Sequence, residues 1–156
     1  MNGAHLHLIT NHLPIVGIII GTLVLIVGLL LKKDQIKQTG LGINVFSAIT
    51  SIFAFLSGEK AEDVVEEIKG ISETLIHTHE EVAELFFTLS LILGALSLIT
   101  LYLSVKVNKY AKFGYFIVLA LSLVLIVIGK QVGTSGGEIR HTEIRAENTV
   151  ISEEDH

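Results

Sequence analysis

Four long apolar runs limit this chain of 156 residues to a membrane fold. The runs cover about 13–31, 41–57, 82–105 and 112–130, and half of all residues are hydrophobic. About 20 residues of helix cross the hydrocarbon core of a bilayer, and a helix satisfies its own backbone polar groups there. We therefore predict an all-α integral membrane four-helix bundle, with residues 1–145 as one domain and 146–156 as an acidic tail.

The run at 41–57 is the shortest and most polar of the four. Asn44 and Ser51 share one side of the helix expected there, which predicts a face turned toward the other helices. In the first run, Gly17 and Gly21 form a small-xxx-small pair that allows close helix packing. If 41–57 did not cross, the N-terminal histidines and the C-terminal ones would lie on opposite sides of the membrane.

Charge distinguishes the two ends of the expected bundle. The connections at 32–37 and 106–112 carry six lysines and one acidic residue, whereas the other end carries five basic and fifteen acidic residues. Short loops rich in Lys and Arg remain in the cytoplasm. We therefore expect both termini on the periplasmic side of a bacterial inner membrane. The acidic outer end gives no support for a nucleic-acid partner.

All seven histidines fall at that same outer end if the chain crosses four times: His5, His7, His12, His77, His79, His141 and His156. Neutral imidazole is the commonest metal ligand in proteins and also ligates haem iron. The chain has no cysteine, which excludes thiolate-bound zinc, iron–sulfur clusters and covalently attached haem. The pattern predicts a cofactor site at one face of a small membrane bundle.

His79 falls on the apolar side of a helix expected over 72–102. Helical spacing places it near the centre of an apolar arc, whereas His77 falls on the polar side. The arc consists of Leu75, Val82, Ala83, Phe86 and Phe87. A buried imidazole needs a partner, because an unsatisfied polar group is costly in an apolar surrounding. That partner is either a metal or another side chain, and the sequence leaves both open.

Two of the remaining histidine segments flank the bundle. Before the first run, either Asn11 caps a helix that begins near Pro14, or the helix begins earlier and Pro14 bends it; both place His12 at the bundle mouth. After the last run, the glycines of 129–137 allow a return over the bundle or a flexible exit. A return would bring His141 and Arg140 toward His12, and Arg140 would suit a haem propionate.

Short motifs in three places resemble those of a bacterial family of four-helix membrane proteins, the domain of unknown function 2231: His7-x4-His12-x-Pro14, His79, and Gly133-x2-Gly136-Gly137-x3-His141. The likeness covers nearly the whole chain. Leu8 stands where the family usually has Pro, and Thr142 where it often has Gly. The resemblance implies four helices and singles out His7, His12, His79 and His141. Some relatives resemble fusions to Rieske-type domains, which implies a redox setting.

Three functions fit these patterns. The first is a b-type haem electron-transfer protein or respiratory-complex subunit, which exchanges electrons with a quinone or a periplasmic cytochrome. His12 and His79 form the first axial pair to test, with His7 and His141 as a second pair or as supporting groups. Phe86 would pack on the porphyrin.

The second function is a non-haem zinc, copper or iron site, in which His79 is joined by Glu80 and Glu84. The third is a cofactor-free accessory subunit of a larger membrane complex or homo-oligomer. The chain has no Ser-His-Asp pattern, phosphate loop or dinucleotide fingerprint. We therefore expect an electron carrier or a subunit rather than a stand-alone enzyme.

Overall fold

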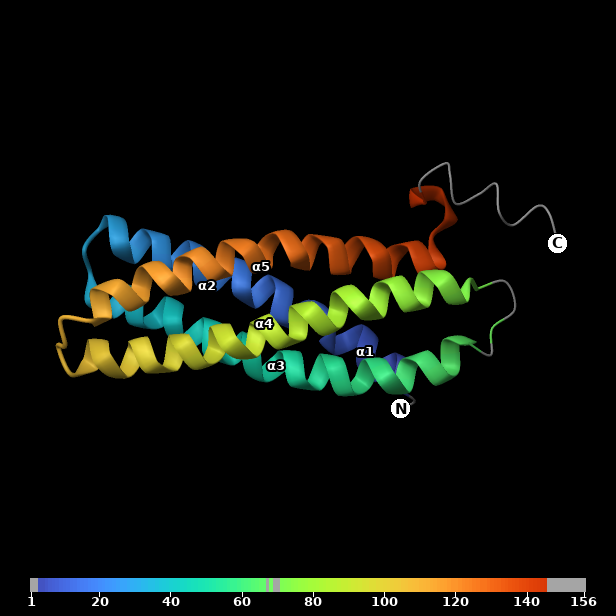
Figure 1. The fold of residues 1–156 in the computed structure, drawn as a ribbon, viewed down its shortest axis with the longest axis horizontal. Helices are drawn as coiled ribbons and strands as arrows, with labels where there is room; N and C mark the ends of the chain where they lie inside the picture. The colour runs from blue at the N-terminus through green and yellow to red at the C-terminus, as the bar shows by residue number, and fades with distance from the viewer. Residues whose placement is uncertain (1–2, 67, 69–70, 146–156) are drawn as a thin grey trace.

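The computed structural model describes residues 3–66, 68 and 71–145, and this part of the chain forms a long helical bundle (Figure 1). Its helices are α1 (Gly3–Thr10), α2 (His12–Leu30), α3 (Asp34–Glu66), α4 (Glu73–Val105), α5 (Ala111–Arg140) and a 3-10 turn at Thr142–Ile144. Each of α2 to α5 packs on its two neighbours in the cyclic order α2, α3, α4, α5. The four-helix architecture predicted from the sequence is confirmed.

Four helical segments are long and apolar enough to cross a bilayer: His5–Leu30, Asp34–Glu62, Glu73–Val105 and Ala111–Arg140. The run at 41–57 lies within α3, which is continuous over 33 residues. The four-crossing prediction is therefore confirmed by length and composition. Large apolar side chains such as Leu23, Phe53 and Leu98 point out of the bundle and are more than half exposed, as expected for helices that face lipid.

Two short turns lie together at one end of the bundle, which we call the lysine end (Figure 1). They connect α2 to α3 at 31–33 and α4 to α5 at 106–110. Lys32 and Val107 adopt positive φ angles of 55° and 52° just beyond the two helix ends. In each turn the next amide bonds back to the carbonyl five residues earlier, at 3.1 Å and 2.9 Å. Both helices thus end in a Schellman motif with a residue other than glycine at its left-handed position.

Glycines bring α2 and α3 into close contact. A methyl group on Gly21 would lie 2.2 Å from Asn44 Oδ1, and one on Gly17 would lie 2.2 Å from Ser47 Oγ. From the α3 side, a methyl group on Gly40 would lie 2.8 Å from the backbone nitrogen of Leu25. The predicted role of Gly17 and Gly21 in close helix packing is confirmed.

The predicted inward face of the second run is also present. Asn44, Ser47, Ala48 and Ser51 are all buried. Phe55 is half-buried, and its ring stacks on Phe87 of α4 with 4.3 Å between centroids. Apolar and small polar residues alternate in the interior, which allows the helix backbones to approach closely.

The opposite end, which we call the histidine end, contains more helix than the sequence suggested. The second run was expected to end near 57, but α3 continues to Glu66, whereas α4 begins at Glu73, in agreement with the helix expected over 72–102. The glycines after 129 neither turn the chain back nor release it, because α5 continues to Arg140. They instead give neighbouring side chains room: the ring of Phe86 lies against Gly129.

The N-terminal helix begins well before the first apolar run. Helix α1 starts at Gly3, and only Asn11 separates it from α2. Asn11 makes no side-chain cap, so the alternative in which Pro14 interrupts an earlier helix is the one observed. Proline has no amide hydrogen for the carbonyl four residues earlier, Thr10. The break lets α1 pack on the last turns of α3.

Candidate functional site

The histidines of the described residues separate into exposed rings and half-buried rings. His5, His12, His77 and His141 are exposed, whereas His7 and His79 are half-buried at the histidine end. His156 lies outside the described residues. The predicted assignment of His79 to the apolar side of its helix and of His77 to the polar side is confirmed.

His7 is held by the last turns of α3. Its Nδ1 lies 3.0 Å from the carbonyl oxygen of Ala54 and 3.4 Å from Ser57 Oγ. The Ser57 hydroxyl itself donates to the Ala54 carbonyl at 3.0 Å. A carbonyl oxygen only accepts hydrogen bonds, so Nδ1 of His7 must carry the proton. Its Nε2 then keeps the lone pair.

His79 is held in the same way by α5. Its Nδ1 lies 3.0 Å from Ser135 Oγ, and the Ser135 hydroxyl donates to the Val132 carbonyl at 3.2 Å. Because that hydroxyl proton is used, Ser135 Oγ accepts from His79 and Nδ1 again carries the ring proton. In His79 too, Nε2 therefore keeps its lone pair.

A glycine next to each serine makes room for the ring. A methyl group on Gly58 would lie 3.3 Å from His7 Cε1, and one on Gly136 would lie 3.0 Å from His79 Cε1. Gly136 was noted in the sequence as part of the glycine motif before His141, but Ser57, Gly58 and Ser135 were not singled out. A Ser-Gly dipeptide occurs near the end of both α3 and α5. This repeat was the sequence signal that could have pointed to them.

His7 and His79 lie at the same end of the bundle in matching surroundings. Two half-buried rings with Nδ1 fixed and Nε2 free are the arrangement that metal-ligating histidines adopt, because the hydrogen bond at one nitrogen orients the other toward the metal.

Both rings lie near the histidine-end limits of two candidate membrane spans, His5–Leu30 and Glu73–Val105. At about 1.5 Å per residue, 20 residues counted from the lysine end of α4 reach Leu85. His79 lies six residues further along the same helix, which is roughly 9 Å beyond that level. The same count along α2 ends near His12, just before α1 and His7. If the hydrocarbon layer begins at the lysine end, both rings would lie at or beyond its far boundary.

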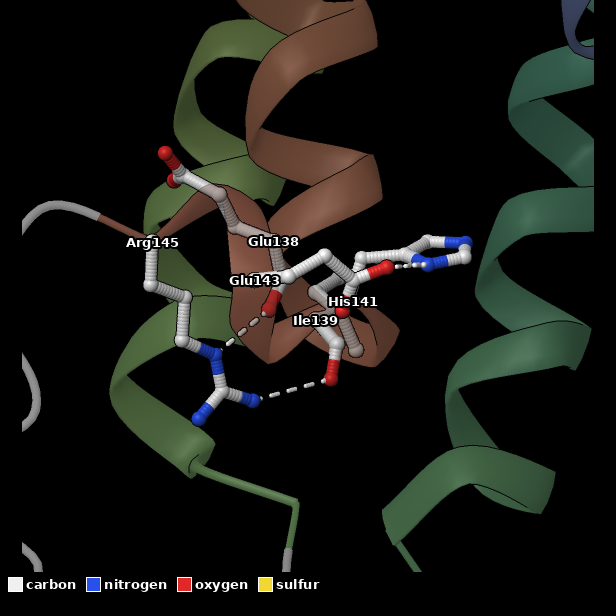
Figure 2. A network of polar contacts seen from close by, with 5 residues as sticks. All are labelled: Glu138, Ile139, His141, Glu143 and Arg145. Atoms are coloured by element: carbon white, nitrogen blue, oxygen red, sulfur yellow. Dashed lines mark hydrogen bonds and ion pairs between the residues drawn. The ribbon is translucent and has the colours of Figure 1, made fainter.

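Three residues predicted for the site lie at the surface. His12 bonds to the side chain of its neighbour Asn11. His141 follows the end of α5, where its Nδ1 lies 2.9 Å from Glu143 Oε1 (Figure 2). Arg140 is the last residue of α5 and is exposed. Their contribution to a cofactor site stays a prediction.

A small polar network closes the end of α5 (Figure 2). Arg145 donates from Nε to the Glu138 carbonyl at 2.8 Å and from its terminal nitrogen to the Ile139 carbonyl at 3.3 Å. These carbonyls belong to the last turn, which has no helical partners of its own. Bonding to its own backbone amide, followed by bonding to His141, lowers the pKa of the Glu143 carboxyl.

The described residues contain no group of three or more His, Cys, Asp or Glu side chains placed to hold a metal ion. Glu80 and Glu84, expected as possible partners of His79, are exposed. Two apolar grooves of about 180 and 240 Å³ lie between α4 and α5 and between α3 and α4, away from the half-buried histidines. The pair His7 and His79 therefore remains the best-formed candidate site in the described part of the chain.

The family comparison agrees with the fold. Residues 3–143 match the profile of a family described as "Predicted membrane protein (DUF2231)". The chain belongs to this family. The match covers all five α-helices and ends just after His141. Neither the curated proteins nor the solved structures contain a significant match to this DUF2231 protein.

Proposed function

We propose that this DUF2231 protein is a small membrane electron-transfer protein, or a respiratory-complex subunit, that binds haem b through His7 and His79. The proposal is carried by one observation: the His7 and His79 rings have the same burial and the same hydrogen bonding at Nδ1. Each is half-buried, each has Nδ1 held by an acceptor on a neighbouring helix, and each therefore presents the lone pair of Nε2. Paired histidines on facing helices are how helical bundles bind haem.

The number of available ligands favours haem over zinc. A structural zinc site takes four protein ligands and a catalytic one takes three, whereas the described residues provide no group of three. Haem iron takes four nitrogens from the porphyrin and needs only two axial ligands from the protein. His7 is also better placed than His12 to be the partner of His79, because the His12 ring is exposed.

The surroundings provide groups of the right kind for haem. Phe86 is buried and Phe87 half-buried, about two turns from His79 on the same helix, where aromatic rings suit a porphyrin face. Arg140 and Lys130 are exposed on the histidine-end half of α5, where cations suit propionates. His12 and His141 then act as supporting groups at the rim.

Charge supports a periplasmic position for this site. Lys32, Lys33, Lys106 and Lys109 lie in or beside the turns of the lysine end, and we propose that this end is cytoplasmic. In a bacterial inner membrane the histidine end then faces the periplasm. A quinone in the adjacent bilayer or a periplasmic cytochrome is the proposed exchange partner.

The test is cofactor content after purification from haem-replete cells. Wild type, His79→Ala and His77→Ala are compared for haem, iron, zinc and copper per chain. His77 lies on the same helix, its side chain is 73% exposed, and its substitution is the matched control. We expect haem in wild type and in His77→Ala, and little in His79→Ala.

Two outcomes would overturn the haem proposal. Zinc or copper without haem, lost only in His79→Ala, would make the protein a non-haem metal protein. Equal contents in all three proteins, or no cofactor in any, would make it an accessory subunit without a cofactor at this site.

A further inference from the structure

The two halves of the bundle repeat each other. The first half comprises α1, α2 and α3, and the second comprises α4 and α5. Each half begins at the histidine end, turns at the lysine end through a Schellman motif with a non-glycine residue at positive φ, and returns (Figure 1). Each half also pairs a histidine near its start with a Ser-Gly dipeptide near its end.

Burial follows the same register in the outgoing helices of the two halves. A shift of 72 residues superposes His7 on His79. With this shift, all six residues of α4 that are buried beyond His79 fall on buried residues of α2. The pairs are Pro14 with Phe86, Ile18 with Ser90, Gly21 with Leu93, Thr22 with Gly94, Leu25 with Ser97, and Gly28 with Thr100.

The returning helices agree in the same way. A shift of 78 residues superposes Ser57 on Ser135. From Val118 onward, the five buried residues of α5 all fall on buried residues of α3. The pairs are Gly40 with Val118, Asn44 with Ser122, Ser47 with Leu125, Ser51 with Gly129, and Ser57 with Ser135. The repeat is one of burial and hydrogen bonding, because residue identities at most of these positions differ.

The residues around the two histidines correspond as well. The shift of 78 that relates the serines also relates Ala54 to Val132, the carbonyls that accept from the two serine hydroxyls. The packing order is symmetric as well: α2 with α3 corresponds to α4 with α5, and α3 with α4 corresponds to α5 with α2. These relations are those of a two-fold pseudo-axis along the bundle.

We infer that His7 and His79 are equivalent ligands, one from each half, which share a single ligand on this pseudo-axis. The inference rests on the proposed function for the identity of that ligand, an iron porphyrin with one imidazole on each face. Ser57 and Ser135 are the matching positioning residues, since each lies beside Nδ1 and thereby leaves Nε2 as the nitrogen that can bind a ligand.

The two serines differ in one respect that the test can use. Ser57 Oγ is the more distant partner of His7, at 3.4 Å against 3.0 Å for the Ala54 carbonyl, whereas Ser135 Oγ lies 3.0 Å from Nδ1 of His79. Ser135→Ala should therefore weaken hemin binding by roughly 10-fold or more, as for loss of an orienting partner. Ser57→Ala should weaken it less, and Ser135→Thr, which restores the hydroxyl, should recover binding.

Hemin titration of the full-length apoprotein tests the equivalence. We expect wild type to form a six-coordinate low-spin complex. His7→Ala and His79→Ala should each give a five-coordinate complex of similarly weakened affinity, and the double variant should give none. His77→Ala is the unaffected control. If one single variant abolishes binding and the other leaves it six-coordinate, the two histidines are not equivalent and the inference is wrong.

A second measurement separates this inference from the haem proposal. The chain has no cysteine, so His7→Cys with His79→Cys introduces one thiol in each half without background. We expect a short bifunctional thiol reagent to crosslink these two thiols. The control combines His5→Cys with His77→Cys on the same two helices, and we expect no crosslink there. If wild type binds no hemin but the first pair is joined, haem is wrong and the shared site stands. If the first pair is not joined, the shared site on the axis is wrong.

Discussion

At the scale of single residues, the site depends on serine and glycine residues that position the His7 and His79 rings. A serine hydroxyl and an adjacent glycine lie next to each half-buried imidazole. The sequence showed that His79 lies on an apolar face, because helical spacing alone determines that. It favoured His12 over His7 as the partner of His79, but the structure half-buries His7 and exposes His12, because the break at Asn11 decides which ring meets α3.

Gly136→Ala should displace the His79 ring. The new methyl group would lie 3.0 Å from Cε1 and 3.3 Å from Nδ1 of that ring, so the ring must move away from Ser135. We expect the side-chain nitrogen resonances of His79 to change in the NMR spectrum of the full-length protein. Hemin affinity should fall by about 10-fold, as for a lost orienting contact.

Gly133→Ala is the matched control, because Gly133 lies on the same helix with nothing within 4 Å of the added methyl group. It should leave the His79 resonances in place and stabilise α5 by about 0.5–1 kcal/mol. Equal displacement of His79 by both substitutions would show that the ring does not rest on Gly136.

At the scale of elements, close contact between α2 and α3 holds the first half together. Gly17 and Gly21 were recognised from their spacing, because a small-xxx-small pair indicates close approach without any knowledge of the partner helix. The partner glycine, Gly40, was not recognised, since its role depends on the register of α3 against α2. The continuation of α5 through its glycines was missed for a similar reason: glycine weakens a helix locally, but packing against Phe86 and His79 favours it here.

Gly40→Ala should destabilise the bundle more than any exposed glycine substitution. Its methyl group would lie 2.8 Å from the Leu25 nitrogen and 2.9 Å from the Gly21 oxygen. Both atoms belong to the backbone, so the two helices must separate. Overpacking of this kind costs about 1–3 kcal/mol, measurable as a lower thermal unfolding midpoint in detergent.

Gly42→Ala serves as the control in the same helix, because nothing lies within 4 Å of its added methyl group. Its unfolding midpoint should equal or exceed that of wild type. If Gly40→Ala unfolds at the same temperature as Gly42→Ala, close contact between α2 and α3 is not a main source of stability.

At the scale of the whole molecule, four apolar runs were enough to predict the bundle, because the bilayer permits few alternatives. The number of crossings also predicted which connections share an end of the bundle. The two lysine-rich turns do lie together at one end (Figure 1). The internal repeat was not visible in the sequence. It consists of burial at corresponding positions, such as Asn44 and Ser122, whose side chains differ, and of hydrogen bonding by Ser57 and Ser135.

The central claim is that two imidazoles at the histidine end hold one haem. The most direct measurement is the dithionite-reduced minus oxidised visible spectrum of the full-length protein from haem-replete cells, beside that of the His7→Ala, His79→Ala double variant. The account predicts sharp α and Soret bands of a six-coordinate b-type haem in wild type and their absence in the double variant. A wild-type spectrum without a Soret band, or bands that persist in the double variant, would contradict it.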